Sequence, residues 1–228
     1  MNYRISIIIP VCNETSIINL TIDTVFSLPR DDTFEVIVVD GSSSGETIRA
    51  IQNREVRTVI AERGRSKQMN KGASLARGDI LLFLHADTRL PKSALQNISS
   101  VMEKKDIVGG AFDLSIQSDR PIFRIIEKAA SVRSRITRIP YGDQAPFIRK
   151  DYFHAVGGFK EMPLMEDVEF MRRLKKAGDK ICIVSEKVKT SPRRWETEGI
   201  LYCTLRNWTI RSLYSLGVSP TKLMRFYR

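Results

Sequence analysis

Uninterrupted apolar runs alternate with amphipathic stretches through the first half of the chain. The runs are residues 5–9, 34–39 and 80–84. A short apolar run without polar alternation predicts a strand that is buried on both faces of a sheet. Between the first two runs, Ile18, Ile22 and Val25 recur at helical spacing. Strands and helices in alternation predict a parallel sheet with right-handed crossovers, so the pattern indicates an α/β fold.

The second half of the chain predicts longer helices. We expect strands over residues 107–114, 181–184 and 188–190, and helices over residues 122–136, 163–178 and most of 196–228. In the helix 163–178, Asp167 falls on the same stripe as Phe170, Met171 and Leu174. The apolar stripe of an amphipathic helix faces the core, so we expect the Asp167 carboxylate to point toward the protein.

The composition is that of an ordinary globular protein, with 42% hydrophobic and 28% charged residues among 228. The sequence shows no charged-then-apolar leader and no run of 18 apolar residues, so we expect neither a signal peptide nor a membrane span. Cys12, Cys182 and Cys203 are odd in number and far apart. This spacing indicates reduced core residues, and we expect a cytoplasmic protein.

The formal net charge of +11 lies in the second half of the chain. Residues 1–119 carry 14 Lys and Arg against 15 Asp and Glu, and residues 120–228 carry 23 against 11. Two interpretations have about equal weight. The excess is either an ordinary solvated surface or a face for an anionic partner, such as a phospholipid surface, a phosphorylated acceptor or nucleic acid.

Three acids stand at the ends of predicted elements. Asp40 and Asp87 each follow a buried strand, and Asp167 lies in the first turn of a helix. Each has an ordinary explanation, because acids favour loops and helix amino ends. His85 and Asp87, however, project to the same side of an extended segment, at the strand end where open α/β sheets bind ligands. We therefore expect Asp87 to hold a divalent metal.

Five stretches resemble the family 2 glycosyltransferases of GT-A fold. They are IIIPVCNE (7–14), VIVVDGSSS (36–44), GRSKQMNKGASLARGD (64–79), LLFLHADT (81–88) and MEDVEF (165–170). The likeness covers about the whole chain. It is strongest for the short bacterial members associated with radical-SAM or selenodomain proteins, whose HADT, YGDQ and LGVSP stretches are matched at residues 85–88, 141–144 and 216–220.

The resemblance implies a GT-A fold, a Rossmann-like nucleotide-diphospho-sugar transferase with a mostly parallel central sheet, flanking helices and C-terminal helices. We expect one domain over residues 1–228. Its nucleotide-sugar half would cover about 1–112, its acceptor half about 113–195, and its C-terminal helices about 196–228. A metal-dependent, inverting transfer from a UDP- or GDP-sugar to an unidentified hydroxyl acceptor is implied. No pattern in the sequence identifies the sugar, the acceptor or the oligomeric state.

The resemblance also assigns roles on the donor side. Asp40 would contact the nucleoside, with Pro10, Glu14 and Arg65 lining the same pocket. Arg65 also lies at a turn before a predicted helix, where a guanidinium group and a helix amino terminus suit phosphate. A solvated turn would be equally basic.

The metal and the base follow from the same resemblance. Asp87 stands where the family's Asp-x-Asp motif ligates the metal, and His85 replaces the first acid, so its contact with ribose or metal stays open. One carboxylate completed by donor phosphates and water suits Mg²⁺ or Mn²⁺. Asp167 would be the general base, with Glu166 beside it.

Four further residues would border the acceptor or the diphosphate. Asp143 and Gln144 precede the helix of Asp167, although a polar turn explains them equally well. Arg194 and Trp195 resemble the end of the family's Gln-x-x-Arg-Trp motif, with Arg194 toward the diphosphate and Trp195 toward the acceptor sugar. A tryptophan at such a junction is more often a packing residue.

The basic second half supports a further hypothesis about membranes. Helix 122–136 and the C-terminal helices, where Leu201, Leu205 and Trp208 share a stripe, would rest on the anionic inner face of a membrane and receive a lipid or lipid-linked acceptor. Packing of these stripes into the core is the competing interpretation.

Two other functions remain as alternatives. A nucleotidyltransferase would need a Gly-rich loop with a lysine after the first strand, which residues 11–14 lack. A basic module for nucleic acid would leave the acids at strand ends unexplained, so we expect no nucleic acid partner.

Overall fold

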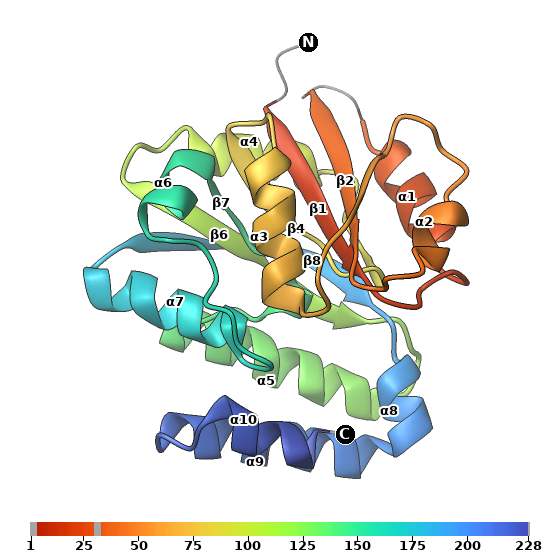
Figure 1. The fold of residues 1–228 in the computed structure, drawn as a ribbon. Helices are drawn as coiled ribbons and strands as arrows, with labels where there is room; N and C mark the ends of the chain where they lie inside the picture. Colours follow the sequence, from red (N-terminus) through yellow and green to blue (C-terminus); the bar gives the residue numbers. More distant parts are fainter. Residues whose placement is uncertain (1–3, 30–32, 228) are drawn as a thin grey trace.

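One mixed sheet forms the centre of the molecule. The structure, a computed structural model, describes residues 4–29 and 33–227. Within these residues the strands form an eight-stranded sheet in the order β3–β2–β1–β4–β7–β6–β8–β5 (Figure 1). The strands are β1 (Ile5–Val11), β2 (Phe34–Asp40), β3 (Arg57–Ile60), β4 (Ile80–Phe83), β5 (Thr88–Arg89), β6 (Ile107–Ile116), β7 (Phe147–Arg149) and β8 (Lys180–Thr190).

Helices cover the sheet and continue past its last strand. The longer helices are α1 (Ile18–Phe26), α3 (Arg65–Leu75), α4 (Ala94–Met102), α5 (Pro121–Thr137), α7 (Glu166–Ala177) and α9 (Ile200–Ser215). The shorter ones are α2 (Glu46–Arg49), α6 (Lys150–Ala155), α8 (Arg193–Glu198), α10 (Pro220–Leu223) and the 3₁₀ turns η1 (Gly142–Gln144) and η2 (Met224–Phe226). The predicted α/β class and the C-terminal helices are therefore present.

The apolar runs form central strands because successive side chains enter different cores. Ile7 and Ile9 of β1 pack in a cluster that includes residues of α1 and α4. Ile8, between them, packs in a second cluster with residues of α3, α6 and α7. All three side chains are fully buried. A strand buried on both faces needs no polar alternation, which is why the unbroken runs predicted these strands.

The sheet is parallel in one part and mixed in the other. β1 pairs in parallel with β2 and β4, and β2 pairs in parallel with β3. β7 then lies antiparallel between β4 and β6, and β5 lies antiparallel to β8. β6 and β8 pair in parallel over most of their length, so the sheet is mostly parallel, as expected, and only the short strands β5 and β7 run antiparallel to their neighbours. The two predicted strands 181–184 and 188–190 form one strand, β8, that pairs with β6 across a register shift.

The parallel register brings several strand ends to one edge of the sheet. Val11 pairs with Asp40, and Ile8 pairs with Phe83, so the segments after β1, β2 and β4 emerge together. Thr88 pairs with Thr190, which ties the chain after Asp87 to the end of β8. This edge is the expected position of a ligand site in an α/β sheet.

The C-terminal helices lie at this end of the molecule beside α5 and α7 (Figure 1). A small cluster built around Leu164, Ile210 and Leu223 attaches α9 and α10 to the segment before α7. The stripe of Leu201, Leu205 and Trp208 does not pack inward. These side chains are 72%, 60% and 51% exposed, so the interpretation that this stripe packs into the core is wrong.

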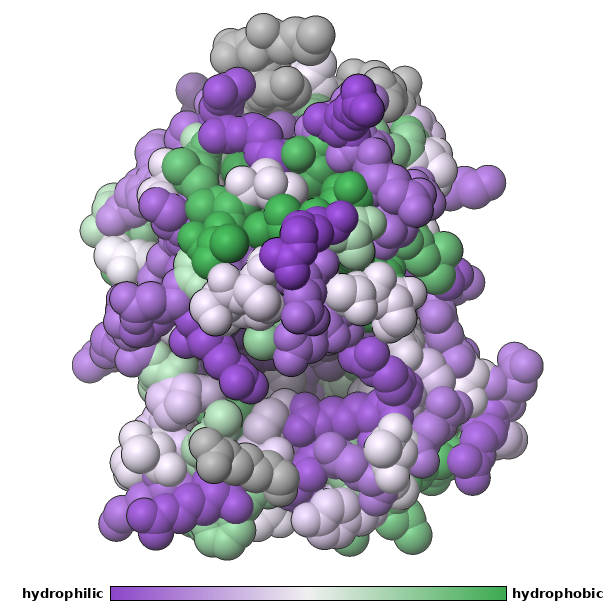
Figure 2. All heavy atoms as spheres, turned by 45° about the vertical axis from the view of Figure 1, so that its right-hand side comes forward, coloured by the Kyte–Doolittle hydropathy of each residue, from purple (hydrophilic) through white to green (hydrophobic). Residues whose placement is uncertain are grey.

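No helix in the described residues has the length and hydropathy needed to cross a bilayer. All three cysteines are free, as expected, but only Cys203 is buried, whereas Cys12 and Cys182 are half-buried. Figure 2 shows a face that is mostly hydrophilic, with a hydrophobic area in its upper part.

Candidate active site

His85 and Asp87 follow the central strand β4 and face one cavity. Both side chains are half-buried, and the intervening Ala86 is buried in the core. The Asp87 backbone carbonyl accepts a hydrogen bond of 3.0 Å from the Ser191 amide, which holds the segment against the end of β8. His85 and Asp87 thus project to the same side, as their spacing predicted.

Asp167 enters the same cavity from the first turn of α7. Its Oδ2 accepts a hydrogen bond of 2.7 Å from the Gly142 amide, and its Oδ1 accepts one of 2.8 Å from the Val168 amide. A methyl group placed on Gly142 would lie 2.8 Å from His85 Nε2 and 3.4 Å from Asp167 Oδ2. Only glycine lets this turn approach both side chains, so the carboxylate is oriented by two backbone donors beside the histidine.

An ion pair between a half-buried arginine and a buried glutamate lies behind Asp167. The Arg65 guanidinium, at the start of α3, donates to the carboxylate of Glu166, which is 1% exposed. Burial alone would lower the pKa of Arg65, but the carboxylates of Glu166 and Asp167 outweigh it and raise that pKa. Arg65 therefore remains cationic and also lines the cavity. Glu166 is occupied by this pair and supports the site from behind.

The cavity itself has a volume of about 240 Å³ and is lined from several elements. Of the predicted site residues, its walls contain Arg65, His85, Asp87, Asp143, Asp167, Arg194 and Trp195. It brings together residues that are far apart in the sequence and mixes carboxylates with guanidinium groups. Such a site suits a ligand that carries both a diphosphate and hydroxyl groups.

Two titratable groups in the cavity have strongly shifted pKa values. Burial, reinforced by the Arg65 guanidinium, lowers the pKa of His85 to about 4, although Asp87 and Asp167 oppose the shift. The imidazole is therefore neutral at neutral pH, and its buried Nε2 has no hydrogen-bond partner among the described residues. Burial raises the pKa of Asp143 to about 6, against the attraction of Arg133. Such shifts concentrate at functional sites.

Arg194 and Trp195 reach the cavity from α8. The Arg194 guanidinium lies 3.9 Å from the centroid of the Tyr227 ring and donates to its hydroxyl and to Glu198. The Trp195 ring packs edge-on against Phe123 of α5, with 5.8 Å between centroids. Its buried Nε1 has no partner in the described chain. Trp195 is thus a packing residue whose one polar atom is left for a ligand.

Five of the predicted site residues are not in the lining of this cavity: Glu166, which supports it through Arg65, Gln144, and the three described next. Pro10, Glu14 and Asp40 belong to the neighbouring strand ends, and they are not among its lining residues. Asp40 is fully buried, with Oδ1 bound to the Ser42 amide at 2.8 Å and Oδ2 without a partner in the described residues. Glu14 pairs with Arg193 at 3.2 Å. We expected Arg65 to share one pocket with these three residues, but of the four only Arg65 lines the cavity.

Gln144 is the clearest correction. It is fully buried, and its side-chain amide donates to the Phe112 carbonyl at 2.8 Å and to the Ser134 hydroxyl at 3.1 Å. Its carbonyl oxygen accepts from Arg133 and from the Tyr141 amide. All of its hydrogen-bonding capacity is used within the protein, so Gln144 holds the turn of Asp143 and does not contact a substrate.

Sequence reasoning missed the residues that close the cavity from the C-terminal side. Tyr141 lies under the Arg133 guanidinium, 3.3 Å from the ring centroid, and its hydroxyl accepts a hydrogen bond of 2.9 Å from Arg211. Cys203, Asn207 and Arg211 line the cavity from α9. Their spacing of four residues is a readable signal, which the more obvious stripe of leucines concealed.

The donor set fits a cation that is only partly held by protein. Asp87 supplies one carboxylate, and His85 supplies a neutral, unpartnered nitrogen beside it. No group of three or more His, Cys, Asp or Glu side chains in the described chain could hold a metal alone. A Mg²⁺ or Mn²⁺ ion here would need oxygens from a bound diphosphate and from water, which is how Mg²⁺ commonly binds at phosphate-transfer sites.

A family model described as glycosyl transferase family 2 matches residues 6–162. A PGL/p-HBAD biosynthesis glycosyltransferase of Mycobacterium bovis (strain BCG / Pasteur 1173P2) is 32% identical over 143 residues, which cover 52% of this chain and 54% of that protein. An uncharacterized glycosyltransferase of Nostoc sp. (strain PCC 7120) is 30% identical over 119 residues, covering 50% and 37%. The match thus spans about half the length of the mycobacterial relative and less of the other.

Solved structures show the same fold. The mannosyltransferase PcManGT from Pyrobaculum calidifontis, in complex with GDP-Man and Mn²⁺, has a TM-score of 0.65 and 21% identity, covering 83% of this chain and 57% of its own. Residues 1–349 of S. aureus TarS, in complex with UDP-GlcNAc, give a TM-score of 0.63 and 17% identity, covering 82% and 58%. These similarities confirm the predicted GT-A fold class.

The raised pKa of Asp143 makes stability depend on pH. Between the ordinary value of 3.8 and about 6, the folded chain binds more protons than the unfolded chain, so stability falls as pH rises through this window. Above it, the ionised carboxylate costs about 3 kcal/mol. We expect Asp143→Asn to match the wild type at pH 4 and to exceed its free energy of unfolding by up to this amount at pH 8.

Urea unfolding between pH 4 and 8 measures this difference. The exposed Asp106, which pairs with Lys180 at 3.1 Å, provides the control. Asp106→Asn should not raise the free energy of unfolding at pH 8. A difference between Asp143→Asn and the wild type that stays constant over the whole pH range would contradict the assignment.

Proposed function

The chain belongs to glycosyl transferase family 2, and from this premise we propose that it transfers a sugar from a nucleotide-diphosphate donor to a hydroxyl acceptor. The observation that carries the proposal is one cavity lined by Asp87, Asp167, Arg65 and Arg194. Solved structures of the same fold hold GDP-Man with Mn²⁺ and UDP-GlcNAc, which supports a GDP- or UDP-sugar donor here.

Asp167 is the general base of this proposal. An attacking hydroxyl must lose its proton, and a carboxylate within about 2.6–3.2 Å can accept it. Backbone donors from Gly142 and Val168 fix the orientation of the Asp167 carboxylate. They leave it lone pairs for the acceptor hydroxyl.

The leaving diphosphate would bind to other residues that line the same cavity. Arg65 and Arg194 offer guanidinium groups that match phosphate oxygens. Asp87, with His85 beside it, would hold Mg²⁺ or Mn²⁺, which when bound supplies positive charge for the departing diphosphate. With the base and the diphosphate on opposite sides of the anomeric carbon, transfer is a single displacement with inversion.

Product analysis separates this function from nucleotidyl transfer. A glycosyltransferase releases a nucleoside diphosphate, whereas a nucleotidyltransferase releases pyrophosphate. Thermal-shift screening of UDP-, GDP- and dTDP-sugars with and without Mn²⁺ identifies the donor to use. Release of pyrophosphate from a nucleotide substrate would replace the proposal with the alternative.

Asp167→Asn tests the base. We expect the rate of nucleoside diphosphate release from the donor to fall by about 10²–10⁴, the usual contribution of general base catalysis. Asparagine keeps the size of the side chain, so donor binding should persist. The matched control is Glu169→Gln on the same helix, because Glu169 pairs with Lys160 and Arg173 away from the cavity. Near wild-type turnover by a folded Asp167→Asn protein would refute the role.

We also propose that the acceptor is lipid or lipid-linked and that α9 rests on the anionic inner surface of a membrane. Its exposed face carries Leu201 and Leu205, and Leu216, directly after its last residue, is 81% exposed. Lys222 and Arg225, which follow on α10 and η2, are exposed. Apolar side chains next to cations suit the interface of an anionic bilayer. The +12 balance of residues 120–228 supports the same partner.

Sedimentation with phosphatidylglycerol vesicles tests this face. We expect the protein to bind, the binding to weaken with salt, and the double substitution Leu201→Asn/Leu205→Asn to reduce the bound fraction several-fold. Leu20→Asn is the matched control, because Leu20 is a leucine of α1 that is 53% exposed. Equal binding by both variants, or none by the wild type, would remove the membrane from the proposal.

A further inference from the structure

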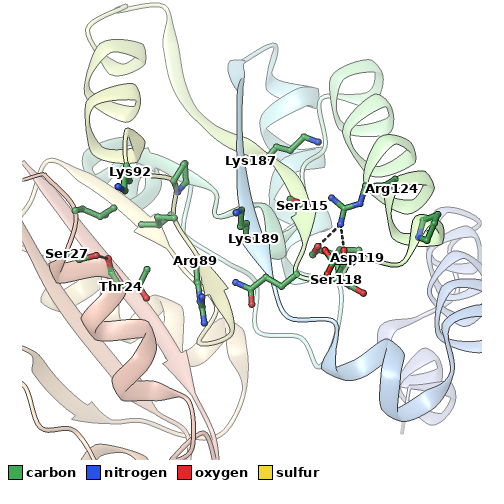
Figure 3. Close-up of a pocket in the computed structure, with 16 residues that line it drawn as sticks. Thr24, Ser27, Arg89, Lys92, Ser115, Ser118, Asp119, Arg124, Lys187 and Lys189 are labelled. Carbon is green, nitrogen blue, oxygen red and sulfur yellow. Dashed lines mark hydrogen bonds between the residues drawn. The ribbon is translucent and has the colours of Figure 1, made fainter.

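A second concave site lies outside the proposed active site, among α1, the β5–β8 pair and the start of α5 (Figure 3). Its volume is about 970 Å³, and it shares no lining residue with the cavity of Asp87 and Asp167. Its cationic lining residues are Arg89, Lys92, Arg124, Lys187 and Lys189. Asp119 is the one carboxylate in the described lining. We call this site the basic groove.

Two of the five cations have partners within the protein. Arg124 donates to the backbone carbonyls of Ile116 at 2.9 Å and Ser118 at 2.7 Å, as the dashed lines in Figure 3 show. It also pairs with Glu127 at 3.0 Å, and Lys187 approaches the same carboxylate at 3.7 Å. These bonds shape the wall of the groove. The carboxylate of the buried Glu127 is therefore already paired with these two cations.

The other three cations have no counter-charge. Arg89, Lys92 and Lys189 form no ion pair or hydrogen bond through their side chains with any described residue. Arg89 and Lys189 are also directly paired residues of antiparallel β5 and β8, so their side chains start from the same face of the sheet. Like charges in this position are destabilising. A bound anion between them would remove that repulsion.

We propose that the basic groove binds a ligand carrying two or more phosphate groups. Three unpartnered cations match several phosphate charges, and the hydroxyl group of Ser118 adds a donor in the same lining. The volume lies in the range of sites for small ligands. A concave site of this depth suits a discrete phosphorylated molecule better than a flat bilayer.

The groove lies next to the proposed active site along the chain. Arg89 is two residues beyond Asp87, and Lys189 precedes Thr190, which lines the catalytic cavity. Thr88 and Thr190, which are buried, separate the two sites through their paired strands. Binding in the groove therefore affects the segment that carries Asp87, whether the ligand is the acceptor or another molecule.

Isothermal titration with phosphates in the presence of EDTA tests the proposal. We expect tripolyphosphate to bind more tightly than pyrophosphate, and pyrophosphate more tightly than inorganic phosphate, with an affinity that falls as salt is added. The double substitution Arg89→Gln/Lys189→Gln should lower tripolyphosphate affinity at least about tenfold, or about 1.4 kcal/mol. Because it removes a like-charge pair, it should not lower the unfolding temperature of the free protein.

Control variants locate the binding. Lys105→Gln/Lys176→Gln removes two exposed lysines elsewhere and should leave tripolyphosphate affinity unchanged. Asp87→Asn should leave it within about twofold, because metal-free binding in the groove does not use Asp87. Nucleoside diphosphate release should persist in Arg89→Gln/Lys189→Gln, so failure of the groove is distinguishable from failure of the transferase function.

Three results would overturn the proposal. The first is equal tripolyphosphate affinity in the wild type and in Arg89→Gln/Lys189→Gln. The second is loss of tripolyphosphate binding in an Arg194→Gln variant with the groove intact, which would locate the anion in the catalytic cavity. The third is a result in which the double substitution weakens binding to phosphatidylglycerol vesicles but leaves the affinity for tripolyphosphate unchanged. The groove would then be part of a membrane surface.

Discussion

The ion pair between the half-buried Arg65 and the buried Glu166 is the constraint on which the site depends. It joins the start of α3, on the nucleotide side of the fold, to the first turn of α7. Removing Arg65 would leave the buried Glu166 carboxylate without its counter-charge, which destabilises the fold. The pair therefore fixes the first turn of α7 over the strand ends. Asp167, the next residue, is held facing the cavity that Asp87 and His85 enter from β4.

Buried polar groups in this protein differ in whether they have hydrogen-bond partners. Glu35 is buried, and its carboxylate accepts from Ser6, Arg57 and the Arg77 amide, so it is fully used in holding the sheet. Around the cavity, by contrast, His85 Nε2 and Trp195 Nε1 are buried without partners in the described residues. Buried polar atoms rarely stay unpaired. Both residues line the cavity, so these atoms are available to a ligand, although unpaired atoms such as Asp113 Oδ1 and Arg173 Nε also occur elsewhere in the described residues.

The sequence was most informative where one local pattern decides the structure. Unbroken apolar runs identified the central strands, and the i, i+2 spacing of His85 and Asp87 predicted their common direction. It was less informative where several partners compete. Gln144 looked like a site residue, but its four hydrogen bonds hold a turn. The stripe of Leu201 fitted either a membrane surface or the core, and it is exposed, whereas the face of α9 that carries Arg211 lines the cavity. The burial of Gln144 is decided by tertiary contacts, which leave no local signal.

The central claim is that a cation at Asp87 and a base at Asp167 lie on opposite sides of the donor sugar. A crystal structure with Mn²⁺ and a non-transferable nucleotide-sugar tests it most directly, because manganese is located by its anomalous scattering. The account predicts manganese bound by Asp87 and the diphosphate, with Asp167 facing the anomeric carbon from the side away from the diphosphate. Manganese remote from Asp87, or Asp167 on the same side of the sugar as the diphosphate, would contradict it.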